Sequence, residues 1–366
     1  MDSDTKAIKD WLNQHQISEV ECLVPDITGN ARGKFIPAHQ FLSSGEPRLP
    51  ESILAQSVTG EYSDEHWDFV EPTDADMILR PDAGTMRLVP WAREPTAQII
   101  HDCYTQDGKA HPLATRNVLR NVLALFEADG LTPVVAPEVE FYLVKKNVDP
   151  DNELTPPEGR SGRSESSRLS YSIDAVAEFE DFVEDMYDYA EAQELQVDTL
   201  IHENGAAQME INFLHGNALS LADQVFTFKR TVRETAHKHD MYATFMAKPM
   251  QSEPGSAMHI HQSLVRTGSG ENIFVDGKGQ HTEAFMNYIA GLQHYTPELI
   301  SFYAPNVNSY RRLAPGIAAP INLNWGLDNR TTAFRVPQSN AAGARVENRF
   351  PGADVNPYLA FAATLA

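Results

Sequence analysis

The stretch VVAPEVEFYLV at 134–144 limits the possible folds of this chain more than any other part of its sequence. Its residues are mostly β-branched, aromatic or leucine, which is typical of a buried strand. Two carboxylates interrupt it, Glu138 and Glu140, and because side chains alternate along a strand, both point to the same face. Like charges on an apolar strand are costly unless a cation lies between them, so the pair predicts a divalent metal site. The alternative is a solvated edge that carries two glutamates.

Length and composition set further limits on the chain. With 366 residues it is too long for one ordinary hydrophobic core, so we expect two domains, 1–105 and 106–366. No apolar run can cross a bilayer, and the first ten residues are too polar for a signal peptide, which favours a cytoplasmic protein without membrane contact. The net charge of −22 argues against nucleic-acid binding. Cys22 and Cys103 form no spaced cluster, and we expect both in the core.

Local patterns predict the main elements of both domains. A helix at 4–14, a β-hairpin around Gly29 and Asn30, and three short strands indicate a small mixed sheet in the first 105 residues. The second domain is expected to contain helices at 114–128, 175–193 and 221–239. Residues 146–167 are rich in Pro, Gly, Ser, Arg and Asp, and we interpret this segment as a long loop that acts as a lid.

Four later segments repeat the arrangement of the first stretch, with apolar residues on one face and ionisable residues on the other. A sheet or open barrel built from such strands has a charged inner wall. The segments are HENGAAQMEINF with Glu203 and Glu210, GSAMHIHQSLV with His259, His261 and Ser263, NRTTAFRVP with Arg330 and Arg335, and GARVENRF with Arg345, Glu347 and Arg349.

These residue types indicate metal-assisted phosphoryl transfer. Five glutamates and one histidine make an oxygen-rich site that suits Mg²⁺ or Mn²⁺ better than zinc. The last 66 residues contain six arginines and no lysine, and guanidinium groups bind phosphate or carboxylate through paired hydrogen bonds. Surface ion pairing is the alternative for these arginines. No GxxxxGKS/T or GxGxxG motif is present, so we expect a bound nucleotide to be held by metals and arginines.

The order of these segments closely resembles the glutamine synthetase family, and the γ-glutamyl polyamine (γ-glutamylputrescine) synthetase-like branch in particular. The resemblance rests on PEVEF, HENGAAQMEINF, GSAMHIHQSL, NSYRRLAPG, NRTTAFRVP and RVENRFPGADVNPYLAFAA, together with FMAKP. It implies an α+β fold, with an N-terminal β-grasp domain and a catalytic domain whose curved, barrel-like antiparallel sheet is flanked by helices. It also implies a ring-stacked homo-oligomer, a dodecamer, with active sites shared between subunits. Members of the family extend beyond the position of Ala366, so we expect the C-terminal end to be incomplete relative to them.

The resemblance also assigns roles to single residues. Glu140, Glu203 and Glu210 match the ligands of the metal beside the amino-acid substrate, and Glu138, His259 and Glu347 match those of the metal that holds the nucleotide phosphates. His261, Ser263 and Asp198 match nucleotide contacts, Arg330 and Arg335 match phosphate-binding arginines, and Gly255, Arg312 and Arg349 match contacts to glutamate. Arg330, Arg349 and Glu203 are the expected catalytic residues. In the family reaction ATP phosphorylates the γ-carboxylate of glutamate, and an amine then displaces phosphate.

Departures from the family pattern concern the amine. The flap motif PGxEAP of ammonia-using members reads PGIAAP here, with Ala318 in place of glutamate, and LPESILAQS around Glu51 replaces a DGSS motif. Loss of a carboxylate creates room and weakens selection for ammonium, so we expect a larger primary amine. Glu51 is suited to a distal ammonium group, whereas Tyr171, Trp325 and Ile317 would favour an apolar or aromatic amine. Pro254 replaces a common asparagine beside Gly255, which leaves the glutamate donor open. An ammonia-using glutamine synthetase and a non-catalytic assembly protein are the alternative functions.

Overall fold

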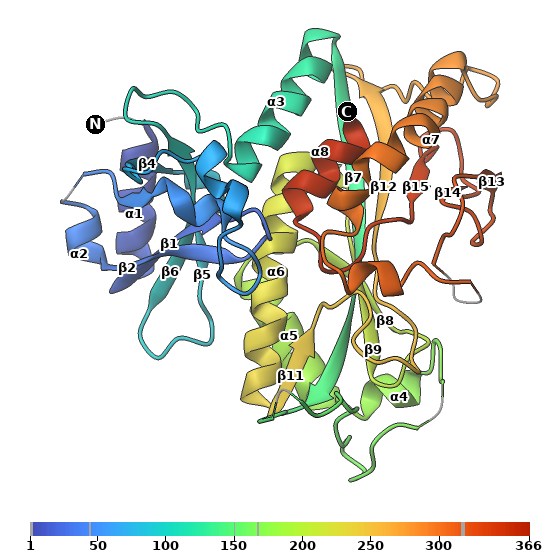
Figure 1. Ribbon diagram of the computed structural model, residues 1–366, viewed down its shortest axis with the longest axis horizontal. Helices are drawn as coiled ribbons and strands as arrows, with labels where there is room; N and C mark the ends of the chain where they lie inside the picture. Colours follow the sequence, from blue (N-terminus) through green and yellow to red (C-terminus); the bar gives the residue numbers. More distant parts are fainter. Residues whose placement is uncertain (1–2, 44, 150, 167, 316–318) are drawn as a thin grey trace.

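Two β-sheets, each with its own helices, make up the computed structural model, which describes residues 3–43, 45–149, 151–166, 168–315 and 319–366 (Figure 1). The smaller sheet has the strand order β2-β1-β6-β4-β3, with β5 paired to β6. Strand β1 is antiparallel to β2 and parallel to β6, so the predicted small mixed sheet is confirmed. Its strands are β1 (Glu19–Pro25), β2 (Ala31–Pro37), β3 (Arg48–Pro50), β4 (Asp76–Pro81), β5 (Arg87–Leu88) and β6 (Thr96–Tyr104).

Short helical segments cover this first sheet. Ile8 and Leu12 of helix α1 (Ser3–Gln14) lie in one apolar cluster with Cys22 and Ile99 of the sheet, as expected for an amphipathic helix. Both cysteines are buried and free. The remaining segments are α2 (Ala38–Phe41) and the 3₁₀ turns η1 (Glu51–Ala55), η2 (Asp64–Asp68) and η3 (Ala83–Thr85). The β-grasp assignment and the boundary near residue 105 stay predictions.

The larger sheet has nine strands in the order β13-β14-β15-β12-β7-β9-β8, with β10 and β11 also paired to β7. All pairs are antiparallel except β13 with β14. The strands are β7 (Leu131–Lys145), β8 (Val197–His202), β9 (Gln208–Phe213), β10 (Gly216–Asn217), β11 (Met241–Thr244), β12 (Met258–Arg266), β13 (Trp325–Leu327), β14 (Phe334–Val336) and β15 (Val346–Asn348). Strand β7 is the long central member through which most of the sheet is joined (Figure 1).

Helices cover one face of the larger sheet and leave the other for polar residues. Val139 and Phe141 of β7 pack in one cluster with residues of α3 (Thr115–Ala128), α5 (Glu180–Ala192), α6 (Ala218–Lys238) and α8 (Pro357–Leu365). Because β-strand side chains alternate, Glu138 and Glu140 lie on the opposite face. The same alternation puts Met258 and Ile260 of β12 in the core and leaves His259 and His261 for the polar face. The charged wall expected from the sequence is therefore confirmed.

One helical prediction differs from the structure, and one helix was not predicted. The expected helix at 175–193 is divided into α4 (Ile173–Ala177) and α5, with the buried Phe179 immediately before α5. Helix α7 (Glu283–Tyr303) was not predicted, and it is followed by the turn η4 (Ser309–Arg311). Among the helices of the described residues, none is both long and apolar enough to span a membrane.

A buried arginine joins the two sheets. The guanidinium of Arg116, at the start of α3, contacts both oxygens of Asp223 on α6 at 2.9 and 2.8 Å. It also contacts Asp102 of β6 at 2.5 Å and Asp82, just after β4, at 2.7 Å. Arg116 is only 3% exposed, so these contacts are shielded from solvent and stronger than surface ion pairs.

Candidate active site

The register of the larger sheet brings the ionisable residues of five strands together on its polar face. His259 of β12 lies opposite Glu138 of β7, and Glu140 of β7 lies opposite Glu210 of β9. On the other side of β12, Glu347 of β15 lies opposite both His261 of β12 and Arg335 of β14. If the register of any of these pairs shifted by one residue, the ionisable side chains of that strand would point into the core. Burial of the apolar face therefore fixes the register that brings the site residues together.

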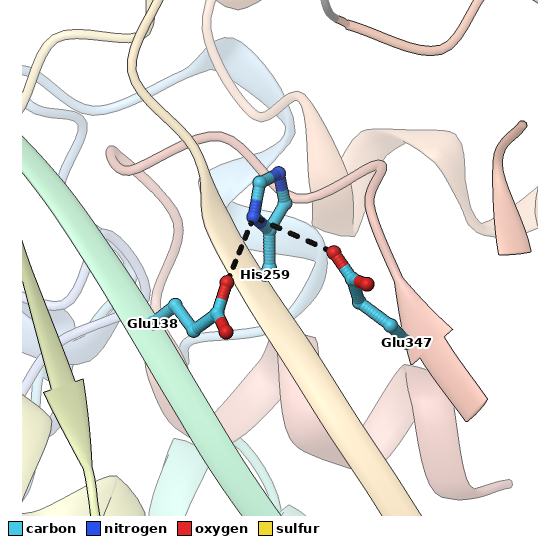
Figure 2. Close-up of side chains that lie close together, drawn as sticks. All are labelled: Glu138, His259 and Glu347. Atoms are coloured by element: carbon cyan, nitrogen blue, oxygen red, sulfur yellow. Dashed lines mark hydrogen bonds and ion pairs between the residues drawn. The ribbon is translucent and has the colours of Figure 1, made fainter. Parts of the chain in front are cut away.

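Glu138, His259 and Glu347 form the first compact group, with one donor atom of each within 4.8 Å of the others. They stand on three neighbouring strands and point toward one another, with His259 between the two glutamates (Figure 2). The Nδ1 atom of His259 lies 3.2 Å from Glu138 Oε2 and 3.8 Å from Glu347 Oε1. Two carboxylates and an imidazole match the donor set predicted for the nucleotide-side metal.

Glu140, Glu210 and His259 form a second group within the same 4.8 Å limit. The sequence predicted Glu203 as the third member, but Glu203 lies on the turn between β8 and β9 and outside both compact groups. Its negative charge still acts on Glu140. Glu138 and Glu140 thus belong to different groups, and the alternative of a solvated edge is wrong because Glu140 is 8% exposed.

The electrostatics of the two groups differ. Burial raises the pKa of Glu138, but hydrogen bonds from His259 and His261 outweigh it and the net pKa is lowered. Burial, together with the charge of Glu203, raises the pKa of Glu140 to about 8. Burial and the charges of Glu138 and Glu140 raise the pKa of Glu210 well above its usual value. Such crowded, desolvated carboxylates fit a divalent cation, whose charge would favour their ionised forms.

Burial lowers the pKa of His259 to about 4, so the ring is neutral at physiological pH. A neutral imidazole is the form that binds metals, and His259 is shared by both groups.

Gln208 of β9 orients Glu140 and was not predicted. Its Nε2 donates to Glu140 Oε2 at 3.1 Å, and the backbone N–H of Ala257 donates to the same oxygen at 2.9 Å. Gln208 is 1% exposed, so this hydrogen bond is sheltered from water. A glutamine two residues before Glu210 falls on the same strand face, and this spacing was the signal in the sequence.

Arginines surround Glu347. Arg335 Nη1 lies 2.7 Å from Glu347 Oε2, and Arg349 contacts the other carboxylate oxygen. Arg330 is exposed in the loop between β13 and β14, and its Nη1 lies 3.4 Å from the hydroxyl of Tyr171. The structure therefore brings Arg335 and Arg349 next to the first group. Arg330 pairs with Tyr171 at the surface, and its positive charge acts on Glu203.

Gly255 and Arg312 are packed against each other. A Cβ at Gly255 would lie 2.6 Å from Arg312 Cγ and 2.6 Å from the carbonyl oxygen of Ala247, so only glycine fits. The Arg312 guanidinium donates to the carbonyl oxygens of Phe350 and Arg349 at 2.8 and 2.9 Å. Burial lowers the pKa of Arg312 to about 10. The three residues predicted to contact glutamate are thus near neighbours.

A pocket of about 450 Å³ adjoins Glu138 and is lined by residues that were predicted to contact the nucleotide. His261, Ser263 and Asp198, which were predicted from different segments to contact the nucleotide, all line it. Arg345, Asn212 and His215 also line it and were not assigned to nucleotide binding. His261 connects the pocket to the first group, because its Nε2 lies 2.8 Å from Glu138 Oε1 and its Nδ1 accepts a hydrogen bond from Arg345.

Of the positions predicted to act on the amine, Glu51 lies apart from the acidic groups. Glu51 lies in η1 of the first sheet, where its carboxylate is 3.2 Å from His111 Nε2. Within the described part of the chain, no ion pair or hydrogen bond joins Glu51 to the candidate metal ligands. Ala318 and Ile317 lie outside the described residues.

Comparisons with known proteins agree with this geometry. The family model of the glutamine synthetase catalytic domain matches residues 112–366. Gamma-glutamylputrescine synthetase PuuA of Escherichia coli (strain K12) is 36% identical, over 99% of this chain and 77% of its own length. Glutamate–isopropylamine ligase of Pseudomonas sp. is 34% identical over 98% of this chain and 78% of its own. Glutamine synthetase of Pyrococcus abyssi is 35% identical over 94% of this chain and 73% of its own.

A solved structure of a GmaS–ADP complex has a TM-score of 0.81 and 26% identity, covering 97% of this chain and 79% of that one. The family model, the relatives that match 94–99% of this chain and the fold all agree, and the chain therefore belongs to the glutamine synthetase family, whose members are ATP-dependent ligases.

Proposed function

We propose that this chain joins the γ-carboxylate of glutamate to a primary amine larger than ammonia, at the expense of ATP and through a γ-glutamyl phosphate. The observation that carries the proposal is the pair of acidic groups that share His259, with the pocket of His261 and Ser263 on one side and Arg312 with Gly255 on the other. In this arrangement the pocket would bind the nucleotide, the two acidic groups would bind the metals, and Arg312 with Gly255 would contact the amino acid.

The residues present fit two Mg²⁺ or Mn²⁺ ions. Glu138, His259 and Glu347 would hold one ion, and Glu140 and Glu210 would hold the other, with oxygen donors that such hard cations prefer. Glu203, on the neighbouring turn, is proposed from the family resemblance as a further ligand of the second ion. When bound, these ions neutralise the charge of the transferring phosphoryl group. Arg335, already beside Glu347, is positioned to add positive charge at the same end of the site.

Arg330 and Arg349 are proposed as the catalytic arginines, with Glu203. Arg330 is exposed and has only the Tyr171 hydroxyl as a hydrogen-bond partner among the described residues, so its guanidinium remains available for a phosphate. Arg349 is buried beside Glu347, and its Nε has no partner there. Such an unpaired buried donor fits a carboxylate or phosphate ligand.

A larger amine is favoured by Ala318, where a flap glutamate would select ammonium, and by the exposed Tyr171, which is 61% accessible beside Arg330. Similarity to both a putrescine-linked and an isopropylamine-linked enzyme is consistent with an amine larger than ammonia. The glutamine synthetases among the relatives keep ammonia as the alternative acceptor.

The test measures phosphate release from ATP with Mg²⁺ and glutamate in the presence of ammonium, putrescine, ethylamine or phenylethylamine. We expect one of the three larger amines to give the highest kcat/KM. Glu138→Ala serves as the inactive control, because loss of a metal ligand removes turnover while folding is retained. If ammonium is the best acceptor, the chain is a glutamine synthetase, and if no amine supports turnover, a non-catalytic assembly role replaces the proposal.

We further propose a ring-stacked homo-oligomer, a dodecamer, in which Glu51 of one subunit completes the amine site of its neighbour. Among the described residues, Glu51 pairs with His111 and makes no ion pair or hydrogen bond with the acidic groups of its own chain. Its carboxylate would suit a cationic amine bound in the site of a neighbouring subunit.

A further inference from the structure

The turn between β8 and β9, which carries Glu203, is fixed by a side chain at the start of β9 and by side chains from two other loops. Three successive backbone N–H groups each donate to a side chain: Gly205 to Gln208 at 2.9 Å, Ala206 to Glu253 at 3.2 Å and Ala207 to Glu165 at 2.7 Å. Gln208 reaches on to Glu140, as described above. The turn is thereby tied to the second acidic group, to the loop before Gly255 and to the loop that follows β7.

The backbone of this turn is strained and closely packed. Ala207 has a φ of +56°, a left-handed conformation that a residue with a Cβ seldom adopts. A Cβ at Gly205 would lie 1.8 Å from the hydroxyl oxygen of Tyr142 on β7, so the turn packs directly on the sheet. A strained backbone of this kind persists where the surroundings determine it, and such sites cluster around functional groups.

Glu165 contacts the turn in two ways, directly through the Ala207 N–H and indirectly through His202. One of its oxygens, Oε2, accepts from the Ala207 N–H and lies 3.0 Å from His202 Nε2. The other ring nitrogen of His202, Nδ1, lies 2.7 Å from the carbonyl oxygen of Glu203. His202 therefore lies between the carboxylate of Glu165 and the backbone carbonyl of Glu203, with one ring nitrogen within hydrogen-bond distance of each. The result is a continuous chain of polar contacts from Glu165 through His202 to the backbone of Glu203.

Burial strengthens this chain. His202 is 1% exposed, and the side chain of Glu165 is 11% exposed. The second carboxylate oxygen, Oε1, is buried and has no partner among the described residues. All the hydrogen bonds of Glu165 are therefore concentrated on the turn and on His202. Other acids in the same loop are exposed, such as Glu158, which pairs with Lys145 at 2.9 Å and is 60% exposed.

We propose that Glu165 is a positioning residue: through His202 and the Ala207 N–H it fixes the turn that presents Glu203 to the second metal, and it ties its own loop to that metal site at Glu165. This inference rests on the function proposed above and names a residue of the lid segment as part of the support for the metal. Outer contacts that orient a metal ligand change metal affinity by about 10- to 100-fold when they are removed.

The experiment measures Mn²⁺ binding to the full chain without nucleotide, by electron paramagnetic resonance of free Mn²⁺. For Glu165→Ala we expect one Mn²⁺ site to weaken by about 10-fold or more. Glu165→Gln keeps an acceptor for Ala207 and loses the charge, so its loss should be intermediate. Glu158→Gln is the matched control from the same loop and should bind Mn²⁺ like the wild type, because an exposed ion pair contributes little.

Two further readouts separate positioning from general destabilisation. In metal-free protein, tryptic cleavage at Arg160 and Arg163, both exposed, should be faster in Glu165→Ala than in Glu158→Gln, because only the first variant loses the contact with the turn. In turnover, Glu165→Ala should raise the apparent Mn²⁺ requirement more than it lowers kcat. The double variant Glu165→Ala/His202→Ala should lose less Mn²⁺ affinity than the sum of the losses in the two single variants, because both residues act through the same series of contacts.

Unchanged Mn²⁺ affinity in both Glu165 variants would overturn the inference. If Glu165→Ala does not fold, the Mn²⁺ affinity of Glu165→Gln alone tests the inference. The two proposals fail separately: a wild type that uses no amine contradicts the proposed function, whereas the Mn²⁺ affinities still decide the role of Glu165.

Discussion

Glu138 and Glu140 stand on one face of β7, yet their surroundings act on their charges in opposite directions. Glu138 receives hydrogen bonds from two histidines, which lower its pKa, whereas Glu140 is buried among other carboxylates and its pKa is raised. Their common face follows from the strand period and could be predicted from the sequence. Their different partners could not, because these depend on the register of β12 on one side of β7 and of β9 on the other.

Glu203 illustrates the same limit. Resemblance to the family groups it with Glu140 and Glu210, whereas the structure groups those two with His259. The position of Glu203 depends on contacts from Glu165 and Glu253, which are 38 and 50 residues away in the sequence. Separations of this kind leave no local signal in the sequence.

Ala318 is the position at which a single substitution should change the choice of amine. We expect Ala318→Glu to lower kcat/KM for phenylethylamine by about 10-fold or more relative to ammonium, because a carboxylate restores selection for a small cation and removes space. The measurement is the ratio of kcat/KM values across the four amines. Ala318→Gln, similar in size and uncharged, distinguishes charge from bulk, and an unchanged amine profile in both variants would show that the flap does not select the amine.

At the level of elements, periodic segments with one apolar face were predictable and interrupted ones were not. Strand β7 and helices α3 and α6 were found within a few residues of their observed bounds. Helix α7 was missed because Gly291 and Pro297 lie inside it, and both residues disfavour helix in isolation. Its core residues Phe285, Ile289 and Leu292 pack with Phe334 and Val346 of the sheet, and this tertiary packing outweighs weak local propensity.

Strand β6 contains a histidine that should make stability depend on pH. His101 is 1% exposed, and burial lowers its pKa to about 4, below the unfolded value of about 6.5. Between these values the unfolded chain binds a proton that the folded chain does not, so stability falls as pH falls. The loss attributable to His101 is about 2 kcal/mol at pH 5.

Urea unfolding at pH 7.5, 6 and 5 checks this dependence. The wild type should lose more stability on acidification than His101→Asn, so the difference between the two proteins should shrink toward pH 5. A constant difference across the three pH values would mean that His101 is not the group responsible.

For the whole molecule, the separation of Glu51 from the acidic groups bears on assembly. If sites are shared between subunits, Glu51→Ala and Glu138→Ala damage different halves of each site. Mixed oligomers of these two variants should then regain activity, with about a quarter of the sites wild type in a random equal mixture around a closed ring. The measurement is putrescine-dependent phosphate release after co-refolding or co-expression. Activity no higher than the average of the parents would place the whole site in one chain.

Arg116 has a mechanical consequence. Its guanidinium joins Asp82 and Asp102 of the first sheet to Asp223 of α6, and the hydroxyl of Tyr358 on α8 adds a fourth group at 2.7 Å from Asp223. Opening a hinge between the sheets would leave these buried charges unpaired, at a cost of about 3–5 kcal/mol. The two sheets of one chain are therefore expected to move as a single rigid unit.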